Sequence, residues 1–391
     1  YAPAVAEAFF QHVPLIILTA DRPPEWIDQL DGQTIRQESI FGQHVKKSYS
    51  LPVSTGHIDS KYHFERIVNE AINLSIDGFS GPVHINVPLR EPFYPTMDKT
   101  IEFDKEVKIV KEEISNPKLS SKQIETLKSE WLKFRKRLIV VGQSNEIGLN
   151  LDLITKDNGI PIVGDIISNT HHNESVIRHQ DIFLGVNNSK VYESLQPDLL
   201  ITFGNSLISK NLKIFLRNHK PKAHWHIQPF DYVADTFQSL TRIIRTTPED
   251  FISNVIEKEK DPFEFQKQNN FYNIWEIEER KVQRHIDQFV SIEPLNEIEA
   301  FKLILSQLNT DCSLHLANSM AVRYANFIGL TSNQKNITVY ANRGTSGIDG
   351  SNSTAFGSAI LSNKETILLT GDMAFFYDRN AFWHNYKANN N

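Results

Sequence analysis

The sequence predicts an α/β protein built on parallel sheets. Short apolar segments recur along the chain, each bounded by Gly, Pro or Asp, and segments with helical spacing separate them. Continuous apolar runs of this kind are typical of parallel strands that helices cover on both faces. The length of 391 residues suggests two or three domains of about 150 residues each. The composition, 40% hydrophobic and 23% charged, is that of a globular protein with an ample core.

The expected strands follow one another along the whole chain. They span residues 14–20, 82–87, 138–142, 198–204, 223–228, 313–317, 337–341 and 366–372. Runs of this length fit strands, whereas helices usually need about 10 residues or more. We expect helices in the stretches between them.

Two stretches interrupt this alternation of strands and helices. After residue 95 a charged segment, poor in apolar residues, leads to an expected helix start near Ser120. Further on, a polar stretch leads into a long amphipathic helix, for which Pro262 marks the expected start. We therefore expect domains at residues 1–100, 101–262 and 263–391.

Charge and cysteine content exclude several classes of function. A net charge of −6 provides no basic field for a polyanion, so we expect no nucleic-acid binding. The single cysteine, Cys312, excludes an internal disulfide and a thiolate-cluster metal site, and we expect it to be a buried core thiol. No apolar run reaches about 18 residues, so we expect no membrane span.

The histidines do not favour a metal site. His171 and His172 are adjacent, whereas two helical ligands of one ion need a spacing of four residues. We expect this pair on a loop at the surface. His84 interrupts an apolar strand and is expected to be a core or interface histidine with its hydrogen bonds satisfied.

Asp372 lies where an apolar strand ends and a helix is expected to begin. In open α/β sheets, ligands bind beyond the carboxyl ends of the strands. A carboxylate there can hold Mg²⁺ that also binds phosphate oxygens, while helix capping is an equally weighted alternative. One strand earlier comes the glycine-rich segment 341–357, which we expect beside Asp372.

These motifs resemble those of the thiamine-diphosphate-dependent enzymes. The sequence GDM at 371–373 is similar to the first half of their GDG signature. Within these enzymes the chain most resembles the 2-succinyl-5-enolpyruvyl-6-hydroxy-3-cyclohexene-1-carboxylate (SEPHCHC) synthase family of menaquinone biosynthesis. The resemblance is carried by YAPAVAEAFFQHVPLIILTADRPPEWID with GQTIRQ, GPVHINVPLREPFYP, ANSMAVR, ANRGTSGIDG and GDMAFFYDRNAFW.

The resemblance implies a fold and a cofactor. It implies three doubly wound, mostly parallel-sheet domains, of which the first and last are incomplete because the chain is truncated at both ends. The implied cofactors are thiamine diphosphate and Mg²⁺ or Mn²⁺. Ile348 is expected beneath the bent cofactor, and Asp372 is expected to bind the metal. The cofactor-binding residues implied are Gly347, Ile348, Gly371, Asp372 and Met373.

The implied substrates, 2-oxoglutarate and isochorismate, carry several carboxylates. The implied transferase decarboxylates the first and adds the remaining carbon skeleton to the second. Such acids need fixed cations, and a guanidinium can bind a carboxylate through two hydrogen bonds. The implied substrate-binding residues are Arg22, Gln33, Lys210, Ser319, Arg323 and Arg343, and catalytic roles fall to Gln33, Arg323 and Arg343.

The glutamate that activates the cofactor in this family would lie upstream of Tyr1, so the chain alone is expected to be inactive. In these enzymes that glutamate and the diphosphate site lie on different subunits, which implies a homodimer or homotetramer in the cytoplasm. Two alternatives stay open at this point. One is another thiamine-diphosphate enzyme, such as an acetolactate-synthase-like enzyme or a 2-oxo acid decarboxylase. The other is a non-catalytic α/β binding module.

Overall fold

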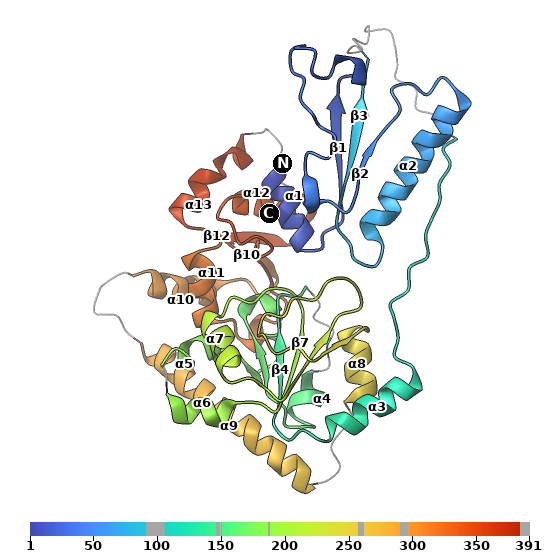
Figure 1. Cartoon of the computed structure of the whole chain (residues 1–391). Coiled ribbons are helices and arrows are strands. Elements are labelled where there is room, and N and C mark those ends of the chain that lie inside the picture. The colour runs from blue at the N-terminus through green and yellow to red at the C-terminus, as the bar shows by residue number, and fades with distance from the viewer. Residues whose placement is uncertain are drawn as a thin grey trace. The chain divides into compact units, whose positions relative to one another are not determined.

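A computed structural model, shown in Figure 1, describes most of the chain. The described residues are 1–90, 106–145, 149, 151–186, 188–256, 262–289 and 296–383. They form two compact units, residues 1–115 and residues 116–391. All strand pairs among the described residues are parallel, and helices connect most of the strands. The predicted α/β class with parallel sheets is confirmed.

The first unit carries a three-stranded sheet in the order β1-β3-β2. Its elements are α1 (Ala2–Phe10), β1 (Leu15–Asp21), η1 (Pro24–Trp26), η2 (Gly42–His44), β2 (Ser48–Ser50), α2 (Ile58–Ile76) and β3 (Pro82–Pro88). The central strand β3 is buried along nearly its whole length. Helix α2 packs Ile67 and Ala71 against Val83 and Ile85 of this strand.

His84 ties the three strands of this sheet together. It lies on β3 and is fully buried. Its Nε2 is 2.8 Å from the hydroxyl of Thr19 on β1, and its Nδ1 is 2.8 Å from the hydroxyl of Ser48 on β2. Both ring nitrogens therefore have partners, and burial lowers the pKa of this histidine. The prediction of a satisfied core histidine is confirmed.

The segment after residue 105 packs on α2. Asn69 donates from Nδ2 to the Lys108 carbonyl at 2.8 Å and accepts from the Val110 amide at 2.6 Å. Asn73 donates to the Val110 carbonyl at 3.0 Å. The segment thus belongs to the first unit by packing, and the domain boundary near residue 100 stays a prediction.

The second unit contains a six-stranded sheet in the order β6-β5-β4-β7-β8-β9. Its strands are β4 (Arg137–Val141), β5 (Ile162–Gly164), β6 (Val176–Ile177), β7 (Leu199–Phe203), β8 (Ala223–Ile227) and β9 (Arg242–Ile244). The strand order reverses between β4 and β7, which is the topological switch point of a doubly wound sheet.

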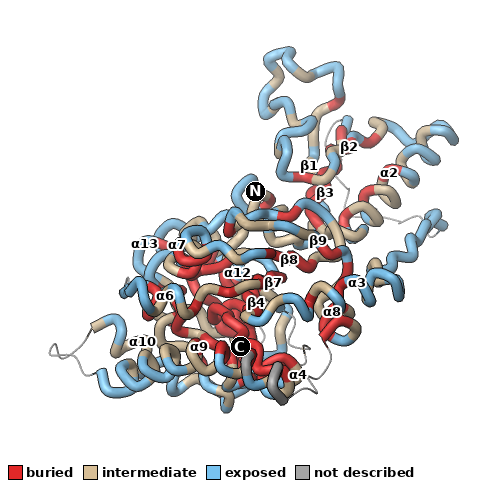
Figure 2. Tube along the Cα trace, turned by 60° about the horizontal axis from the view of Figure 1, so that its bottom comes forward, coloured by how far each residue is buried: buried red, intermediate tan, exposed pale blue. Residues whose placement is uncertain are grey.

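Helices cover both faces of this sheet. One face is covered by α3 (Ser121–Trp131), α4 (Leu151–Thr155) and α8 (Pro248–Val255). The other is covered by α5 (Gln180–Phe183), α6 (Ser189–Leu195), α7 (Lys210–Asn218) and α9 (Pro262–Gln288). Successive residues of β4 alternate between the two cores, as the period of two in a strand requires. Figure 2 shows the buried residues concentrated in the strands, while much of α3 and α10 is exposed.

Two helix starts were predicted correctly. Ser120 and Gln123 form a capping box at the start of α3, in which each side chain bonds to the main chain of the other residue. Helix α9 begins at Pro262. Its residues Phe271 and Trp275 pack in the core of the six-stranded sheet. The domain boundary near residue 262 stays a prediction.

A second, three-stranded sheet completes this unit, in the order β11-β10-β12. Its elements are α10 (Glu297–Gln307), β10 (Cys312–Leu316), α11 (Met320–Ile328), η4 (Ser332–Gln334), β11 (Thr338–Tyr340), α12 (Ser351–Leu361), β12 (Glu365–Leu369), α13 (Asp372–Tyr377) and η5 (Arg379–Phe382). Its core includes Ile167 of η3 (Ile166–Ser168) and Ile208, which follows β7. Loops that follow two strands of the six-stranded sheet therefore contribute to the core of the sheet β11-β10-β12.

The predicted strands were all found, with ends that shift by at most three residues. The strands that the sequence did not indicate are β2, β5, β6 and β9, each of two or three residues. Runs this short carry too little periodic signal to be recognised. Cys312 is fully buried on β10, as predicted, and burial raises the pKa of its thiol to about 11. No helix among the described residues has both the length and the apolar character needed to cross a membrane.

The prediction of a surface position is wrong for His171. This residue is 3% exposed, and its Nε2 lies 3.2 Å from the Gln334 carbonyl. Burial lowers its pKa to about 4. The physical reason is that the loop after β5 is enclosed between the two sheets of the second unit, where its neighbours Ser168 and Asn169 are also buried.

Acid is expected to destabilise the sheet β11-β10-β12 through His315. This residue on β10 is 5% exposed and stacks on Tyr340, with 5.0 Å between the ring centroids, and burial lowers its pKa to about 4. Between about pH 6.5 and pH 4 the unfolded chain takes up a proton that the folded chain does not. The free energy of unfolding therefore decreases as the pH is lowered through this range. We expect His315→Phe to reduce this fall by about 1–3 kcal/mol.

The measurement is urea denaturation of both proteins at pH 7 and pH 4.5. The exposed His285 on α9 provides a control, and His285→Phe should leave the pH dependence unchanged. An identical fall in His315→Phe and the unmodified protein would show that the buried imidazole is not responsible.

Candidate functional site

The carboxyl ends of the three strands β10, β11 and β12 meet at one edge of their sheet. The strands are parallel, and His315 of β10 is paired with Tyr340 of β11 and Leu368 of β12. The loops that follow them therefore lie together. They and the starts of the helices behind them carry these predicted site residues: Ser319, Arg323, Arg343, Gly347, Ile348, Gly371, Asp372 and Met373.

The glycine-rich turn and the start of α13 share an apolar cluster. Ile348 packs against Ala317, Ala321 and Ala374, which are all buried. Ala374 lies two residues after Asp372 on α13. The predicted neighbourhood of the turn and the strand end that precedes Asp372 is therefore what the structure shows. The branched side chain of Ile348 thus connects the glycine-rich turn to α13.

The amino-terminal part of α12 is bound to the carboxyl-terminal half of α13. Asn352 donates from Nδ2 to the Phe375 carbonyl at 2.9 Å. Ser353 donates from its amide and its hydroxyl to the Asp378 carboxylate, at 2.6 and 2.7 Å. These bonds fix the position of α13, and thus of the carboxylate at its first residue.

Asp372 is the first residue of α13 and is exposed. The residue before it, Gly371, is the N-cap, and no side chain forms a cap hydrogen bond there. The alternative of a capping aspartate is therefore not supported. A Cβ at Gly371 would meet no atom within 4 Å, so the backbone borders open space.

The donor set around Asp372 fits a magnesium ion that is shared with a diphosphate. The described residues contain no group of three or more His, Cys, Asp or Glu side chains that could hold a metal. Asp372 offers one exposed carboxylate at the first residue of α13. Mg²⁺ is commonly bound through one or two carboxylates, with phosphate oxygens and water filling the other positions.

The turn before α12 needs its glycines and leaves polar atoms without partners. A Cβ at Gly347 would lie 2.4 Å from an oxygen of Asp349, and Gly350 has φ +81°. Just beyond, Ser351 Oγ and Asn352 Oδ1 are buried and have no hydrogen-bond partner among the described residues. Buried polar atoms are normally satisfied, so this arrangement fits a polar cofactor group at the start of α12.

Arg343 is partly buried, and the six-stranded sheet supports its loop. Ser206 donates from its hydroxyl to the Arg343 carbonyl at 3.0 Å, and Gln143 donates from Nε2 to the Ala341 carbonyl at 2.9 Å. Gln143 follows β4 and Ser206 follows β7, the two strands at the switch point. The loops beyond β4 and β7 also touch, because a Cβ at Gly142 would lie 2.2 Å from the Asn205 carbonyl oxygen.

Ser319 and Arg323 lie on one side of α11. They are four residues apart, the spacing that brings two side chains onto one helix face, and both are exposed. Ser319 is the N-cap of α11 with φ 71° and ψ −125°, and its side chain makes no cap bond. A non-glycine residue in this conformation stores strain, which is frequent at functional sites.

Lys210 is the first residue of α7 and is exposed. It follows the loop that contains Ser206, and its role toward a substrate stays a prediction. Lys213, which the sequence did not single out, is partly buried and donates to the Leu207 carbonyl at 2.8 Å. Burial lowers the pKa of Lys213, and the positive charge of Arg343 adds to that shift.

Arg22 and Gln33 lie in the first unit. Arg22 Nε is 3.4 Å from a carboxylate oxygen of Asp31, so it ties down its own loop. Gln33 is exposed, with φ 63°. Their roles toward the substrate stay predictions.

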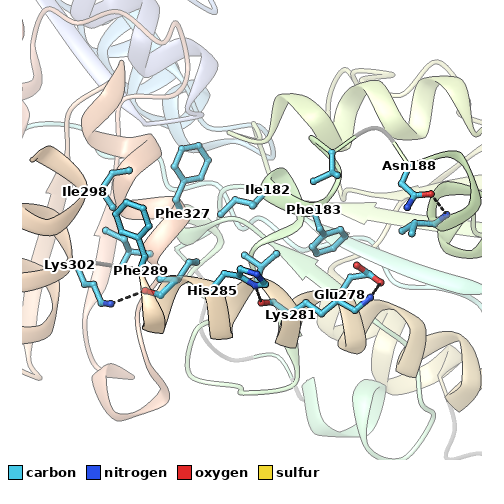
Figure 3. Close-up of a pocket in the computed structure, with 15 residues that line it drawn as sticks. Ile182, Phe183, Asn188, Glu278, Lys281, His285, Phe289, Ile298, Lys302 and Phe327 are labelled. Carbon is cyan, nitrogen blue, oxygen red and sulfur yellow. Dashed lines mark hydrogen bonds and ion pairs between the residues drawn. The ribbon is translucent and has the colours of Figure 1, made fainter. Parts of the chain in front are cut away.

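A separate cavity lies between α9 and the helices α5, α6, α10 and α11, as Figure 3 shows. Its volume is about 490 Å³, and most of its lining is apolar. The lysines that line it are engaged: Lys281 binds Glu278 at 2.7 Å, and Lys302 donates to the Ile286 carbonyl at 2.8 Å. None of the predicted site residues lines this cavity.

Sequence reasoning missed several polar residues behind the site. They are buried or partly buried and contact main-chain atoms of the Arg343 loop or of β11: Gln143, Asn169, Ser206 and Asn318. Only Asn318 carried a local signal, since it lies inside the ANSMAVR motif directly after an apolar strand. The others lie more than 130 residues from their partners, so no local pattern could reveal them.

Comparison with known proteins shows which family model and which relatives this chain resembles. Residues 110–316 match the family model described as "Middle domain of thiamine pyrophosphate". A protein of Cytophaga hutchinsonii is 42% identical over 391 residues, which cover 100% of this chain and 68% of the relative. A protein of Flavobacterium psychrophilum is 37% identical, with 100% and 68% covered, and one of Bacteroides fragilis is 37% identical, with 99% and 67% covered. All three are named 2-succinyl-5-enolpyruvyl-6-hydroxy-3-cyclohexene-1-carboxylate synthase.

Proposed function

Since this chain belongs to the SEPHCHC synthase family of thiamine-diphosphate enzymes, we propose that its protein joins 2-oxoglutarate to isochorismate with loss of CO₂. This is a transferase reaction of menaquinone biosynthesis. The observation that carries the proposal is that Ile348, Asp372 and Arg343 all follow strands whose carboxyl ends meet at one edge of the same sheet. Ile348 would support the cofactor, Asp372 would bind the metal, and Arg343 would pair with an acid substrate.

The residues at the ends of β11 and β12 would hold the cofactor. Asp372 would ligate Mg²⁺ or Mn²⁺, and Gly371 leaves room for a diphosphate to approach the main chain. Ile348 would support the ring junction of the cofactor from the cluster on which it packs. Gly347 and Met373 are proposed as further contacts. Thiamine diphosphate, when bound, supplies the nucleophilic carbon and the electron sink for decarboxylation.

The arginines would bind and orient the acid substrates. We propose that Arg343 and Arg323 pair with substrate carboxylates, and Ser319 offers an exposed hydroxyl on the same helix face as Arg323. Charge pairing is needed because a carboxylate in a water-poor site is costly unless it is bound by a cation. We propose Arg22, Gln33 and Lys210 as further substrate-binding residues, and Gln33, Arg323 and Arg343 as those that act in catalysis.

The chain spans about two thirds of the length of its curated relatives. We propose that the whole protein is a homodimer or homotetramer in the cytoplasm and that residues 1–391 alone are inactive. The experiment on function therefore uses the whole protein, with thiamine diphosphate, Mg²⁺, 2-oxoglutarate and isochorismate. CO₂ release and formation of the joined product are expected. Turnover with pyruvate alone, and none with this pair, would refute the proposal.

Replacing Arg343 by lysine is expected to raise the KM for 2-oxoglutarate about tenfold, because an ammonium cannot match a bidentate guanidinium contact. The measurement is steady-state kinetics with 2-oxoglutarate as the varied substrate. Arg284 on α9 is exposed and lies outside the site, so Arg284→Lys provides a matched control that should keep the KM. An unchanged KM in Arg343→Lys would remove Arg343 from the substrate site.

A further inference from the structure

One buried amide links the two functional parts of the strand-end site. Asn318 follows β10 and is 3% exposed. Its Nδ2 donates to the Asn342 carbonyl and to the Gly347 carbonyl, both at 2.6 Å. Its Oδ1 accepts from Arg343 Nη1 at 3.0 Å. One side chain thus contacts the guanidinium and both ends of the loop between residues 342 and 347.

The chemistry of these three contacts requires a primary amide. Two main-chain carbonyls require two N–H donors, and the guanidinium requires an acceptor. A primary amide presents two donors and an acceptor in one plane, whereas a carboxylate of the same size has only acceptors. Asn318 therefore fits all three partners, and neither Asp nor Leu could replace it at this position.

The position of Asn318 couples two features of the site. Gly347, whose carbonyl it binds, directly precedes Ile348, which packs against Ala317, Ala321 and Ala374. The next residue along the chain, Ser319, keeps a strained backbone with φ 71°. Strained residues persist where the surrounding contacts determine their conformation, and the buried amide beside Ser319 provides such contacts.

We propose that Asn318 is a positioning residue: its side chain fixes both the Arg343 guanidinium and the turn at Gly347 that carries Ile348. This inference rests on the proposed function, in which Arg343 binds a substrate carboxylate and Ile348 supports the cofactor. Loss of the amide frees the guanidinium from its acceptor and the turn from its donors. Substrate affinity and cofactor affinity then fall together, although Asn318 touches neither molecule.

The test measures both affinities in the whole protein with Asn318→Ala. We expect the KM for 2-oxoglutarate to rise about tenfold and the Kd for thiamine diphosphate, from calorimetric titration with Mg²⁺, to rise about fivefold, as the loss of buried hydrogen bonds allows. Asn318→Asp keeps the acceptor but loses both donors, so its Kd for the cofactor should also rise. It serves as the second variant if Asn318→Ala does not fold.

A double-mutant cycle separates positioning from general destabilisation. In an Arg343→Ala background, Asn318→Ala should change the KM less than about threefold, because effects of coupled residues do not add. Asn342→Ala is the matched control: Asn342 lies in the same loop, and its Nδ2 donates to the Thr354 hydroxyl at 3.0 Å. Its KM and Kd should stay within about twofold of the unmodified protein, as usual for an exposed contact.

Two results would overturn the proposal: an unchanged KM and Kd in Asn318→Ala, or an equal rise in KM with and without Arg343. Absence of turnover by the unmodified protein would instead refute the proposed function. In that event the calorimetric titration of Asn318→Ala still decides whether the amide supports the turn below Ile348.

Discussion

Replacing Asp372 by asparagine is expected to weaken the Mg²⁺-dependent binding of thiamine diphosphate by more than about 100-fold, since loss of a residue that only orients a metal ligand already costs 10- to 100-fold. Asp372 is exposed at the first residue of α13 and makes no cap bond. Its carboxylate is therefore not needed to hold the helix. Asparagine keeps the size of the side chain and removes the charge that a hard divalent cation requires.

The measurement is calorimetric titration of the whole protein with thiamine diphosphate, with and without Mg²⁺. Asp311 provides the control, because it lies at the opposite end of the same sheet and pairs with Lys364 at 2.8 Å on the surface. Asp311→Asn should bind the cofactor normally. If Asp372→Asn binds it as tightly as the unmodified protein does, the metal is held elsewhere.

Replacing Trp275 by alanine is expected to lower the free energy of unfolding by about 3–5 kcal/mol, the usual cost of removing a large aromatic side chain from a core. Trp275 is fully buried on α9. Its ring meets Phe183 and Phe215 edge to face, with centroids 5.9 and 6.1 Å apart. The substitution would leave a cavity between α9 and the helices α5 and α7, which carry Phe183 and Phe215.

The midpoint of urea denaturation, followed by circular dichroism, measures this loss. Trp275→Phe provides the comparison, since it keeps most of the ring and removes Nε1, a buried donor without a partner among the described residues. Trp275→Phe should cost much less than Trp275→Ala. Equal and small losses would mean that α9 contributes little to the stability of the six-stranded sheet.

The sequence allowed prediction of those parts of the fold that are written in local patterns. The run at 198–204 is mostly apolar and became the buried central strand β7. Strand β6, with only Val176 and Ile177, left no such pattern. The neighbourhood of Ile348 and Asp372 could also be predicted, because parallel strands in one sheet bring their carboxyl ends to one edge.

The supports of the site could not be predicted, because they depend on long-range contacts. Asn169 binds both main-chain groups of Val339, a residue 170 positions away. His171 was expected at the surface, and what buries it is η4, more than 150 residues later, where its partner Gln334 lies. A single sequence does not state which distant segments will meet.

The loops of the six-stranded sheet that enter the core of the sheet β11-β10-β12 limit how the protein can be divided. Ile167 and Ile208 come from the six-stranded sheet's own loops, yet they are buried against β10 and α11. A fragment cut between the sheets would uncover these side chains on one piece and their neighbours on the other, and both pieces would tend to aggregate. Chimeras with distant relatives should therefore exchange residues 116–383 as a block. Ile167 and Ile208 then come from the same protein as the β10 and α11 residues that they contact.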